Sequence, residues 1–221
     1  MISTGHPVPF EELRSADLSV GRIYQGGPQP HVGADPLSPL AGVGNSGGFR
    51  TRKVKGSRAT ALCVLYSTGQ MTEWPDRWDS NGRYVYFGDQ REPGQDVLDT
   101  PRRGNRLLAE VDSWLKQGIP GRRRVPPFLL FVKVGRGRDV RFEGLLAPAS
   151  DIHWLTVDRR QTRHGEILNF RATMSRLSVQ SVTRQWLNEL QIGNPSGTHA
   201  PTAWTDWIDA GNGRDDHGAN R

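Results

Sequence analysis

Strand-like segments outnumber helix-like segments in this chain, and the two kinds do not alternate in strict order. The strongest is the apolar run at 59–66 (ATALCVLY), which predicts a buried strand. Further strands are predicted at residues 84–87, 128–134, 140–146, 154–157 and 167–172, with a short one at 20–24. About six strands in this order favour an α+β fold with a curved, mostly antiparallel sheet over a doubly wound parallel sheet.

Three or four helices complete the predicted elements. Apolar residues recur at helical spacing over 104–118 and 179–192, with a glycine at the end of each segment. Residues 9–17 predict a short helix, and residues 204–208 predict a last short helix, whose Trp204 and Trp207 would either dock on the body or face a missing domain. The helices therefore flank a sheet that carries most of the fold.

The length of 221 residues suits one large domain followed by a tail. We assign residues 1–210 to the domain and the polar residues 211–221 to a flexible tail or linker. Cys63 stands alone in an apolar run, so it cannot form an internal disulfide. The sequence shows neither an N-terminal apolar segment nor a long apolar span, which predicts a soluble, cytoplasmic protein without a membrane partner.

The charge is basic and is carried mainly by arginine. The net charge is +6 and the pI is about 10.0, so an acidic partner is expected. Of the 29 basic residues, 4 are lysine and the other 25 are arginine. Arginine makes planar, bidentate contacts to phosphate and to guanine edges, although a GC-rich genome would favour arginine codons equally well. The clustering of basic residues at 50–58, 102–106, 122–124 and 136–138 is more informative about a binding partner than the net charge.

Several catalytic and metal-binding patterns are absent from the sequence. It contains neither a GxxxxGK[ST] phosphate loop nor GxGxxG, and its six histidines form no pair with metal-ligand spacing. Lys133 is the only lysine on a strong predicted strand, and no acid stands two residues before it, so a metal-dependent nuclease centre is not expected. The chain is therefore interpreted as a binding module without a catalytic site, metal or cofactor.

One segment, residues 83–106, combines several chemical groups within a short span. A strand at 84–87 is broken by Gly88, and a polar loop with Pro93 and Gly94 follows. Thr100 before Pro101 suits a helix N-cap and first turn. The segment thus presents aromatic rings, a carboxylate, an amide and several guanidiniums, which could hold a nucleobase beside a phosphate backbone.

The order of the motifs resembles the N-terminal DNA-recognition domain of the MspJI/AspBHI type of modification-dependent restriction endonucleases, over about residues 24–207. The motifs on which the resemblance rests are YQGG (24–27), DPL (35–37), GGFR (47–50), WPDRWD (74–79), YVYFGDQREPG (84–94) and DTPRRGN (99–105). The resemblance implies an SRA-like fold, a crescent-shaped curved sheet or half-barrel with flanking helices. It also implies that 5-methylcytosine in duplex DNA is flipped out and read in a pocket, within the cytoplasm of a bacterium. The cutting would then belong to a nuclease domain or subunit missing from this chain.

A pocket for a flipped cytosine needs stacking surfaces and a group that reads the base edge. Asp89 is the main candidate, because a carboxylate accepts a hydrogen bond from the exocyclic amine of cytosine and would reject thymine. The alternative is that Asp89 only forms a turn after Gly88, and ordinary core packing is the alternative for each aromatic residue. The pocket candidates are Asp89, Trp74, Trp78, Tyr84, Tyr86 and Gln90.

A second set of residues is expected to contact the DNA backbone or grooves. By the resemblance, the 25–48 loop and the hairpin around residues 136–138 would fill the gap left by the flipped base. The other basic residues would mostly meet phosphates, which gives affinity and salt dependence but little sequence information. The set comprises Gln29, His31, Arg50, Arg52, Lys53, Lys55, Arg91, Arg102, Arg103, Arg106, Arg136 and Arg138.

The leading hypothesis is the recognition module of a modification-dependent, type IV-like restriction system, a host-defence function. It would bind duplex DNA that contains 5-methylcytosine or 5-hydroxymethylcytosine. One alternative is a reader of other modified or unmodified nucleic acid through the same basic face. A second is a nucleotide-processing enzyme with Asp89 as general base, and a third is a basic structural or adaptor protein.

Overall fold

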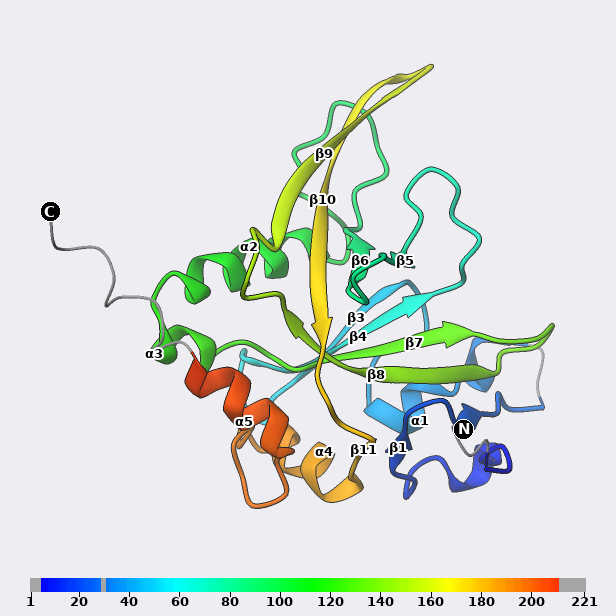
Figure 1. The fold of residues 1–221 in the computed structure, drawn as a ribbon. Coiled ribbons are helices and arrows are strands. Elements are labelled where there is room, and N and C mark those ends of the chain that lie inside the picture. Colours follow the sequence, from blue (N-terminus) through cyan, green and yellow to red (C-terminus); the bar gives the residue numbers. More distant parts are fainter. Residues whose placement is uncertain (1–4, 29–30, 211–221) are drawn as a thin grey trace, which may run out of the picture.

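The computed structural model describes residues 5–28 and 31–210 of the chain. Gln29 and the predicted tail at 211–221 lie outside the described residues. Within the described ranges, nine strands form one sheet and two more form a small separate pair (Figure 1). No helix in these ranges has the length and apolar character needed to cross a bilayer.

The large sheet has a defined strand order, and the α+β, mostly antiparallel prediction is confirmed. Its path runs through β3 (Phe49–Lys53), β4 (Thr60–Ser67), β7 (Phe128–Lys133), β8 (Val140–Pro148), β10 (Gly165–Arg176), β6 (Tyr84–Phe87) and β5 (Arg77–Trp78). The β4–β7 pair is parallel, and the other neighbouring pairs along this path are antiparallel. Two strands lie off this path, β2 (Ile23–Tyr24) beside β8 and β9 (Leu155–Thr162) beside β10. The separate pair is β1 (Leu18–Ser19) with β11 (Ser181–Val182).

The sheet curls strongly. β3 and β6 are five steps apart along the strand path, which in a flat sheet would separate them by about 24 Å. The ring centroids of Phe49 on β3 and Tyr86 on β6 nevertheless lie 6.2 Å apart. The two ends of the path, β3 and β5, do not pair within the described residues, so the sheet is a half-barrel and not a closed barrel.

Burial explains why β4 and β7 could be predicted from the sequence. Residues 61–65 of β4 and 128–131 of β7 are buried without interruption, so both faces of these strands are covered. A continuous apolar run is the expected pattern for such strands. Cys63 is buried here as a free thiol.

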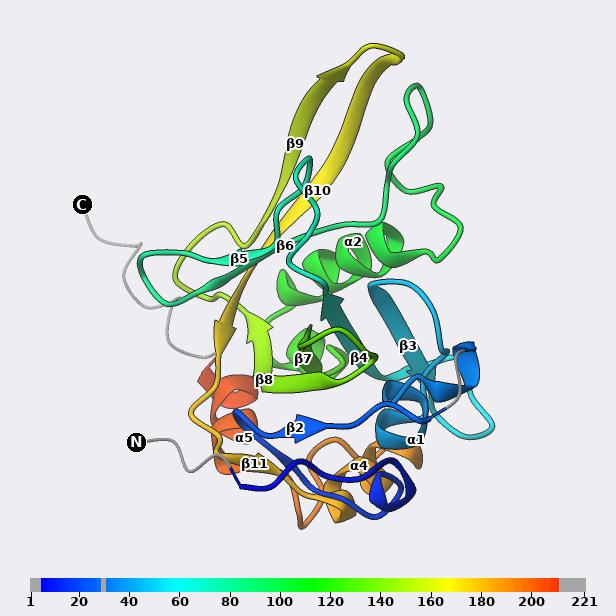
Figure 2. The same ribbon diagram turned by 90° about the vertical axis from the view of Figure 1, so that its right-hand side faces the viewer.

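The strands β9 and β10 extend well beyond the segments predicted at 154–157 and 167–172. They form a long hairpin that projects from the body as an arm (Figures 1 and 2). Residues 156–162 alternate between half-buried and exposed positions and are mostly polar. The outer part of the arm therefore lacks the apolar signal on which the sequence prediction depended.

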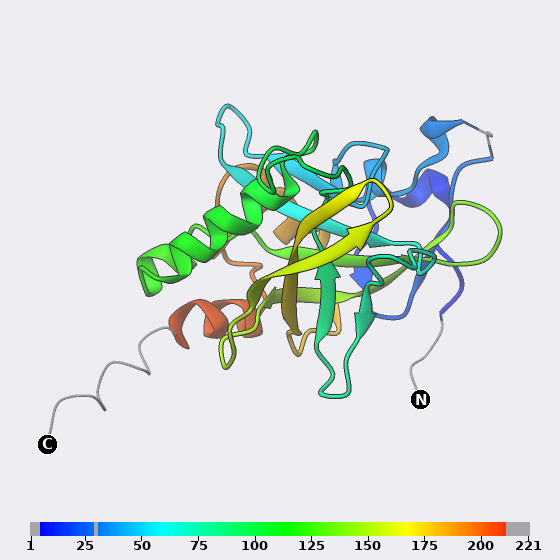
Figure 3. The same cartoon turned by 90° about the horizontal axis from the view of Figure 1, so that it is seen from above.

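The helices are shorter than predicted in several places. They are α1 (Leu37–Ala41), α2 (Gly104–Leu115), α3 (Ile119–Arg122), α4 (Arg184–Gln191) and α5 (Thr202–Asp209). The predicted helix at 179–192 begins only at Arg184, because Ser181 and Val182 pair with β1 and the Thr183 hydroxyl caps the helix by accepting the Trp186 N–H at 3.2 Å. Residues 9–17 form only a short 3-10 turn at Phe10–Glu12. Figures 1 and 3 place α2 and α5 on the same side of the body.

The C-terminal helix docks on the body, which is the first of its two predicted placements. Trp204 is fully buried, and its ring stacks on Trp207 with centroids 5.2 Å apart and lies 6.0 Å from Trp186 of α4. The indole Nε1 of Trp207 donates to the carbonyl oxygen of Pro148 at 3.2 Å. These rings join α4, α5 and the end of β8 into one core.

Replacing Trp204 by alanine is expected to lower the free energy of unfolding by about 3–5 kcal/mol, because it leaves a large cavity between Trp186 and Trp207. Urea denaturation followed by circular dichroism measures this loss. The matched control is Thr202→Ala, an exposed position on the same helix, which should change stability little. A small effect of Trp204→Ala would show that α5 does not belong to the cooperative core.

Candidate nucleic-acid interface

A hollow opens where β6 ends against the start of β3. It has a volume of about 220 Å³, and we call it the β6 hollow. Its wall consists of Gly48, Phe49, Tyr86, Gly88, Asp89, Arg91, Pro101 and Arg102. The space is smaller than a drug-sized site of roughly 300–1,000 Å³, and it combines aromatic, acidic and basic side chains.

The alternation of β6 divides the predicted aromatic residues between two faces. Tyr84 and Tyr86 belong to the main core, whereas Val85 and Phe87 form a separate cluster with Trp74 and Ile167. Trp74 is only 2% exposed and packs 5.3 Å from the Phe87 ring. The structure therefore does not place Trp74, a predicted pocket residue, on the wall of the hollow.

Trp78 and Tyr84 contact each other edge to face, with centroids 5.0 Å apart. The Arg176 guanidinium covers the Trp78 ring at 5.2 Å. Of the four aromatic candidates, only Tyr86 lines the β6 hollow. Its burial raises its pKa well above the usual value of 10.0, so the phenol stays protonated.

Asp89 holds the start of α2. Its two carboxylate oxygens accept the backbone N–H groups of Gly104 at 3.0 Å and Asn105 at 2.9 Å. The helix begins there, and not at Pro101, because Arg103 adopts a left-handed conformation with φ of 55°. The prediction of a Thr100 N-cap is therefore wrong, since a carboxylate from a distant part of the sequence replaces a local cap. Asp89 still lines the hollow, and each oxygen retains a lone pair.

Two buried asparagines fix the loop that follows β6. Asn169 of β10 donates from Nδ2 to the Gly88 carbonyl at 3.1 Å, and its Oδ1 accepts Nδ2 of Asn105 at 3.1 Å. Both side chains are fully buried. At Gly88 a Cβ would collide with Oδ1 of Asn105, so glycine is required by the close approach as well as by the end of the strand.

Gln90 belongs to this framework and does not face the hollow. It is 2% exposed; its Nε2 donates to the Asp96 carbonyl, and its Oε1 accepts the N–H groups of Arg91 and Glu92. Its assignment to the base edge is therefore corrected to a role in shaping the 88–103 loop. Sequence reasoning could not separate the two roles, because an amide after a strand suits both.

Asp76 is a candidate that sequence reasoning missed. β5 and β6 pair Arg77 with Val85 and Trp78 with Tyr84, and the same register carried one pair further sets Asp76 opposite Tyr86. Its Oδ1 accepts the Phe87 N–H at 3.0 Å. Burial raises its pKa from 3.8 to about 6, although hydrogen bonds from Phe87 and Ser67 and the charge of Arg91 oppose this shift. The sequence feature that could have pointed to Asp76 is its position between the two tryptophans of the WPDRWD motif.

A second hollow of about 560 Å³ lies at the β7–β8 hairpin, which we call the hairpin hollow. It is lined by Gly27, Pro28, Asp35, Tyr66, Lys133, Arg136, Gly137, Arg138 and Val140. Gly48 connects the two hollows, because a Cβ there would lie 3.0 Å from both the Tyr66 carbonyl oxygen and the Tyr86 hydroxyl. Arg91 and Arg102 line the β6 hollow, and Lys133, Arg136 and Arg138 line the hairpin hollow. We call the surface formed by these two neighbouring hollows the rim.

The structure places the predicted DNA-contact residues in different parts of the molecule. Arg91, Arg102, Arg103, Arg106 and Arg136 are exposed, and Arg138 is half-buried, on or near this rim. Lys53 lies at the opposite end of β3 from Phe49, and Lys55 follows it, so neither belongs to the rim. Half-buried Arg52 donates to the Ala41 carbonyl at 3.4 Å. His31 accepts the Gly33 N–H and caps the short turn at 32–34.

Arg50 is buried among partners within the protein. It is 5% exposed, pairs with Asp35 at 2.8 Å and donates to the carbonyl oxygens of Gly44 and Gly47. Its guanidinium also lies 5.1 Å from the centre of the Tyr66 ring. The phosphate role expected for Arg50 is therefore replaced by a structural one, which holds the 42–48 loop and Tyr66 at the rim.

The geometry suits binding of a polymer that carries planar bases and anionic phosphates. Among the described residues, no group of three or more His, Cys, Asp or Glu side chains could hold a metal ion. The rim instead offers exposed guanidiniums around one aromatic, carboxylate-lined hollow. Guanidiniums of this kind suit contacts to phosphate oxygens, so the surface is a candidate nucleic-acid interface.

Comparison with known proteins identifies the class as the DNA-recognition domains of modification-dependent restriction endonucleases. The chain belongs to the family described as restriction endonuclease AspBHI N-terminal, which matches residues 18–217. The restriction endonuclease AspBHI shares 37% identity over 92% of this chain and 95% of its own, with a TM-score of 0.83. The recognition domain of the cytosine modification-dependent endonuclease LpnPI shares 31% identity over 94% and 92% of the two chains, with a TM-score of 0.80.

A more distant structure supports the fold alone. MspJI in complex with a 27-mer oligonucleotide shares 21% identity over 88% of this chain and 52% of its own, with a TM-score of 0.68. No curated protein sequence matches this chain significantly. The chain is thus a recognition domain and not the catalytic part of such an enzyme.

Replacing Asp76 by asparagine is expected to stabilise the protein above about pH 6 and much less below about pH 4. Because the folded-state pKa is raised, the stability contributed by this carboxyl is complete below the unfolded pKa of 3.8 and is lost as the pH rises through about 6, by on the order of 3 kcal/mol. Urea denaturation across this range measures the difference. Asp99→Asn, an exposed control, should show no such dependence, and parallel curves for Asp76→Asn would contradict the expectation.

Replacing Asp89 by alanine is expected to cost about 1–2 kcal/mol of stability, because two N–H groups of α2 lose their acceptor. The free energy of unfolding in urea measures this cost. Asp99→Ala, in the same loop and exposed, is the matched control and should be nearly neutral. Equal losses in the two variants would rule out the capping role.

Proposed function

We propose that this domain binds duplex DNA containing 5-methylcytosine or 5-hydroxymethylcytosine and takes the flipped base into the β6 hollow. The observation that carries the proposal is the hollow itself, with Tyr86, Asp89, Arg91 and Arg102 on one wall. Membership in the recognition family of modification-dependent enzymes supports the ligand class. Removing a base from the stack costs a few kcal/mol, which the hollow must return through stacking and hydrogen bonds.

In this proposal two carboxyl groups compete for the base edge. Asp76 is not part of the wall of the hollow, but it is the stronger candidate because the β5–β6 register sets it opposite Tyr86, which is on the wall, and because burial raises its pKa. A carboxylate accepts from the exocyclic amine of cytosine, and a protonated carboxyl also donates to a ring nitrogen. Asp89 lies on the wall of the hollow and can accept the same amine only through the lone pairs that α2 leaves free.

The surrounding cations would bind the DNA backbone. Arg102, Arg103 and Arg106 crowd the start of α2, and Arg136 and Arg138 stand at the hairpin hollow. These side chains would contact phosphates on the two sides of the flipped base or fill the gap it leaves. Such contacts add affinity and salt dependence without selecting the modification.

The test is a fluorescence-anisotropy titration with three matched duplexes that differ at one cytosine: unmodified, 5-methylated and 5-hydroxymethylated. We expect a preference of about tenfold or more for a modified duplex, and Asp76→Asn should remove most of it, at a cost of about 1–3 kcal/mol. Asp89→Asn should reduce the preference less, because the N–H groups of Gly104 and Asn105 already occupy part of the acceptor capacity of Asp89.

Asp99→Asn is the control for both substitutions, because Asp99 is exposed in the same loop. Equal, salt-sensitive binding of the three duplexes by the unaltered protein would refute modified-cytosine reading. A preference that survives Asp76→Asn but is lost in Asp89→Asn would move the edge contact to Asp89.

A further inference from the structure

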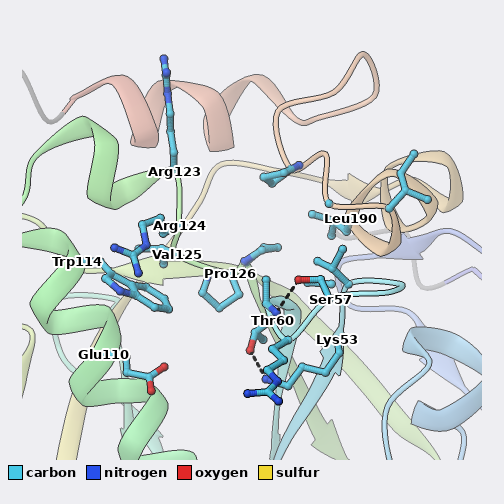
Figure 4. A pocket seen from close by; sticks show the side chains of 18 residues that line it. Lys53, Ser57, Thr60, Glu110, Trp114, Arg123, Arg124, Val125, Pro126 and Leu190 are labelled. Carbon is cyan, nitrogen blue, oxygen red and sulfur yellow. Dashed lines mark hydrogen bonds between the residues drawn. The ribbon is translucent and has the colours of Figure 1, made fainter.

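Two basic runs that are far apart in the sequence converge on a cleft away from the rim. The cleft, which we call the distal cleft, has a volume of about 610 Å³ (Figure 4). It lies between the β3–β4 turn, α2, the segment after α3 and the end of α4. Its basic residues are Lys53, Arg58, Arg123 and Arg124, and its acidic residue is Glu110.

The cations of the distal cleft are poorly neutralised. Lys53 donates from Nζ to the Thr60 hydroxyl at 3.0 Å, and Arg124 lies 4.8 Å from the centre of the Trp114 ring. Within the described ranges, Arg58 has no ion pair, and Glu110 pairs with none of the cations. A concave surface with this excess of positive charge attracts an anion.

The distal cleft is separate from the β6 hollow. Phe49, at one end of β3, lines the hollow, and Lys53, at the other end, lines the cleft. Four residue steps along a strand span about 13 Å. One flipped base therefore cannot occupy both sites, and a ligand in the cleft needs its own explanation.

We propose that the distal cleft binds the phosphodiester backbone of nucleic acid as a second contact, independent of the modified base. Planar guanidiniums suit phosphate oxygens, and the hydroxyls of Ser57 and Thr60 can add hydrogen bonds. The floor is apolar, with Val125, Pro126 and Leu190, and suits the sugar (Figure 4). Trp114 and Arg124 add a stacked pair at the edge, a combination found where proteins bind strands without reading sequence.

The experiment compares the unaltered protein with the double variant Arg58→Glu/Arg124→Glu. A short unmodified duplex and the matching single strand, each fluorescently labelled, are titrated by anisotropy over a range of salt concentrations. The control carries Lys116→Glu. Lys116 is the exposed C-cap residue of α2, two residues after Trp114 and so on the side opposite to it, where it pairs with Asp112. A labelled polyglutamate peptide is titrated in parallel.

We expect the double variant to bind one of the two nucleic acids at least about fivefold more weakly and to lower the salt slope by about two. If the duplex is the nucleic acid whose binding weakens, the cleft binds duplex backbone; if it is the single strand, the cleft binds single-stranded backbone. The relative preference for a modified duplex should stay unchanged, which separates this result from a failure of the β6 hollow. Unchanged binding, an equal loss in Lys116→Glu, or polyglutamate bound as tightly as nucleic acid would overturn the proposal.

Discussion

The contact between Phe49 and Tyr86 closes the curl of the sheet, and the candidate site depends on it. Without this curl, the start of β3 and the end of β6 would lie on opposite sides of a flat sheet. The curl places Gly48 and Arg102 beside Asp89, and the hollow forms between them. The Asp89 carboxylate then fixes the start of α2, so the helix, the loop and the strand share one anchor.

The buried polar groups around this anchor have different energetic roles. Asn105 and Asn169 are fully buried and hydrogen-bonded to each other and to neighbouring backbone groups, so they stabilise the loop. Asp76 is also largely enclosed, but its raised pKa shows that its hydrogen bonds do not fully offset the loss of water. The ionised Asp76 carboxylate therefore lowers the stability of the fold, whereas the two asparagines raise it.

The sequence predicted the fold class and the central strands because burial on both faces leaves long apolar runs, as in β4 and β7. It did not predict the length of the β9–β10 arm, whose residues alternate and are largely polar. Of the predicted site, Tyr86, Asp89, Arg91 and Arg102 come together in one hollow. Gln90 and Trp74 do not, because Gln90 is held by a hydrogen bond to the Asp96 carbonyl within its own loop and Trp74 packs on the Phe87 ring of β6. Asp76 was missed since only the β5–β6 register brings it opposite Tyr86.

Within the described part of the chain, the half-barrel leaves the outer edges of β3 and β5, the two ends of the strand path, without a partner strand. An open edge presents unpaired backbone groups that can recruit a strand from another molecule. β5 is only two residues long, and β3 carries half-buried Arg52 and exposed Lys53. Short and charged edge strands resist such pairing. Part of the positive charge of this protein therefore lies where it opposes strand pairing between separate copies, whatever ligand the remaining cations bind.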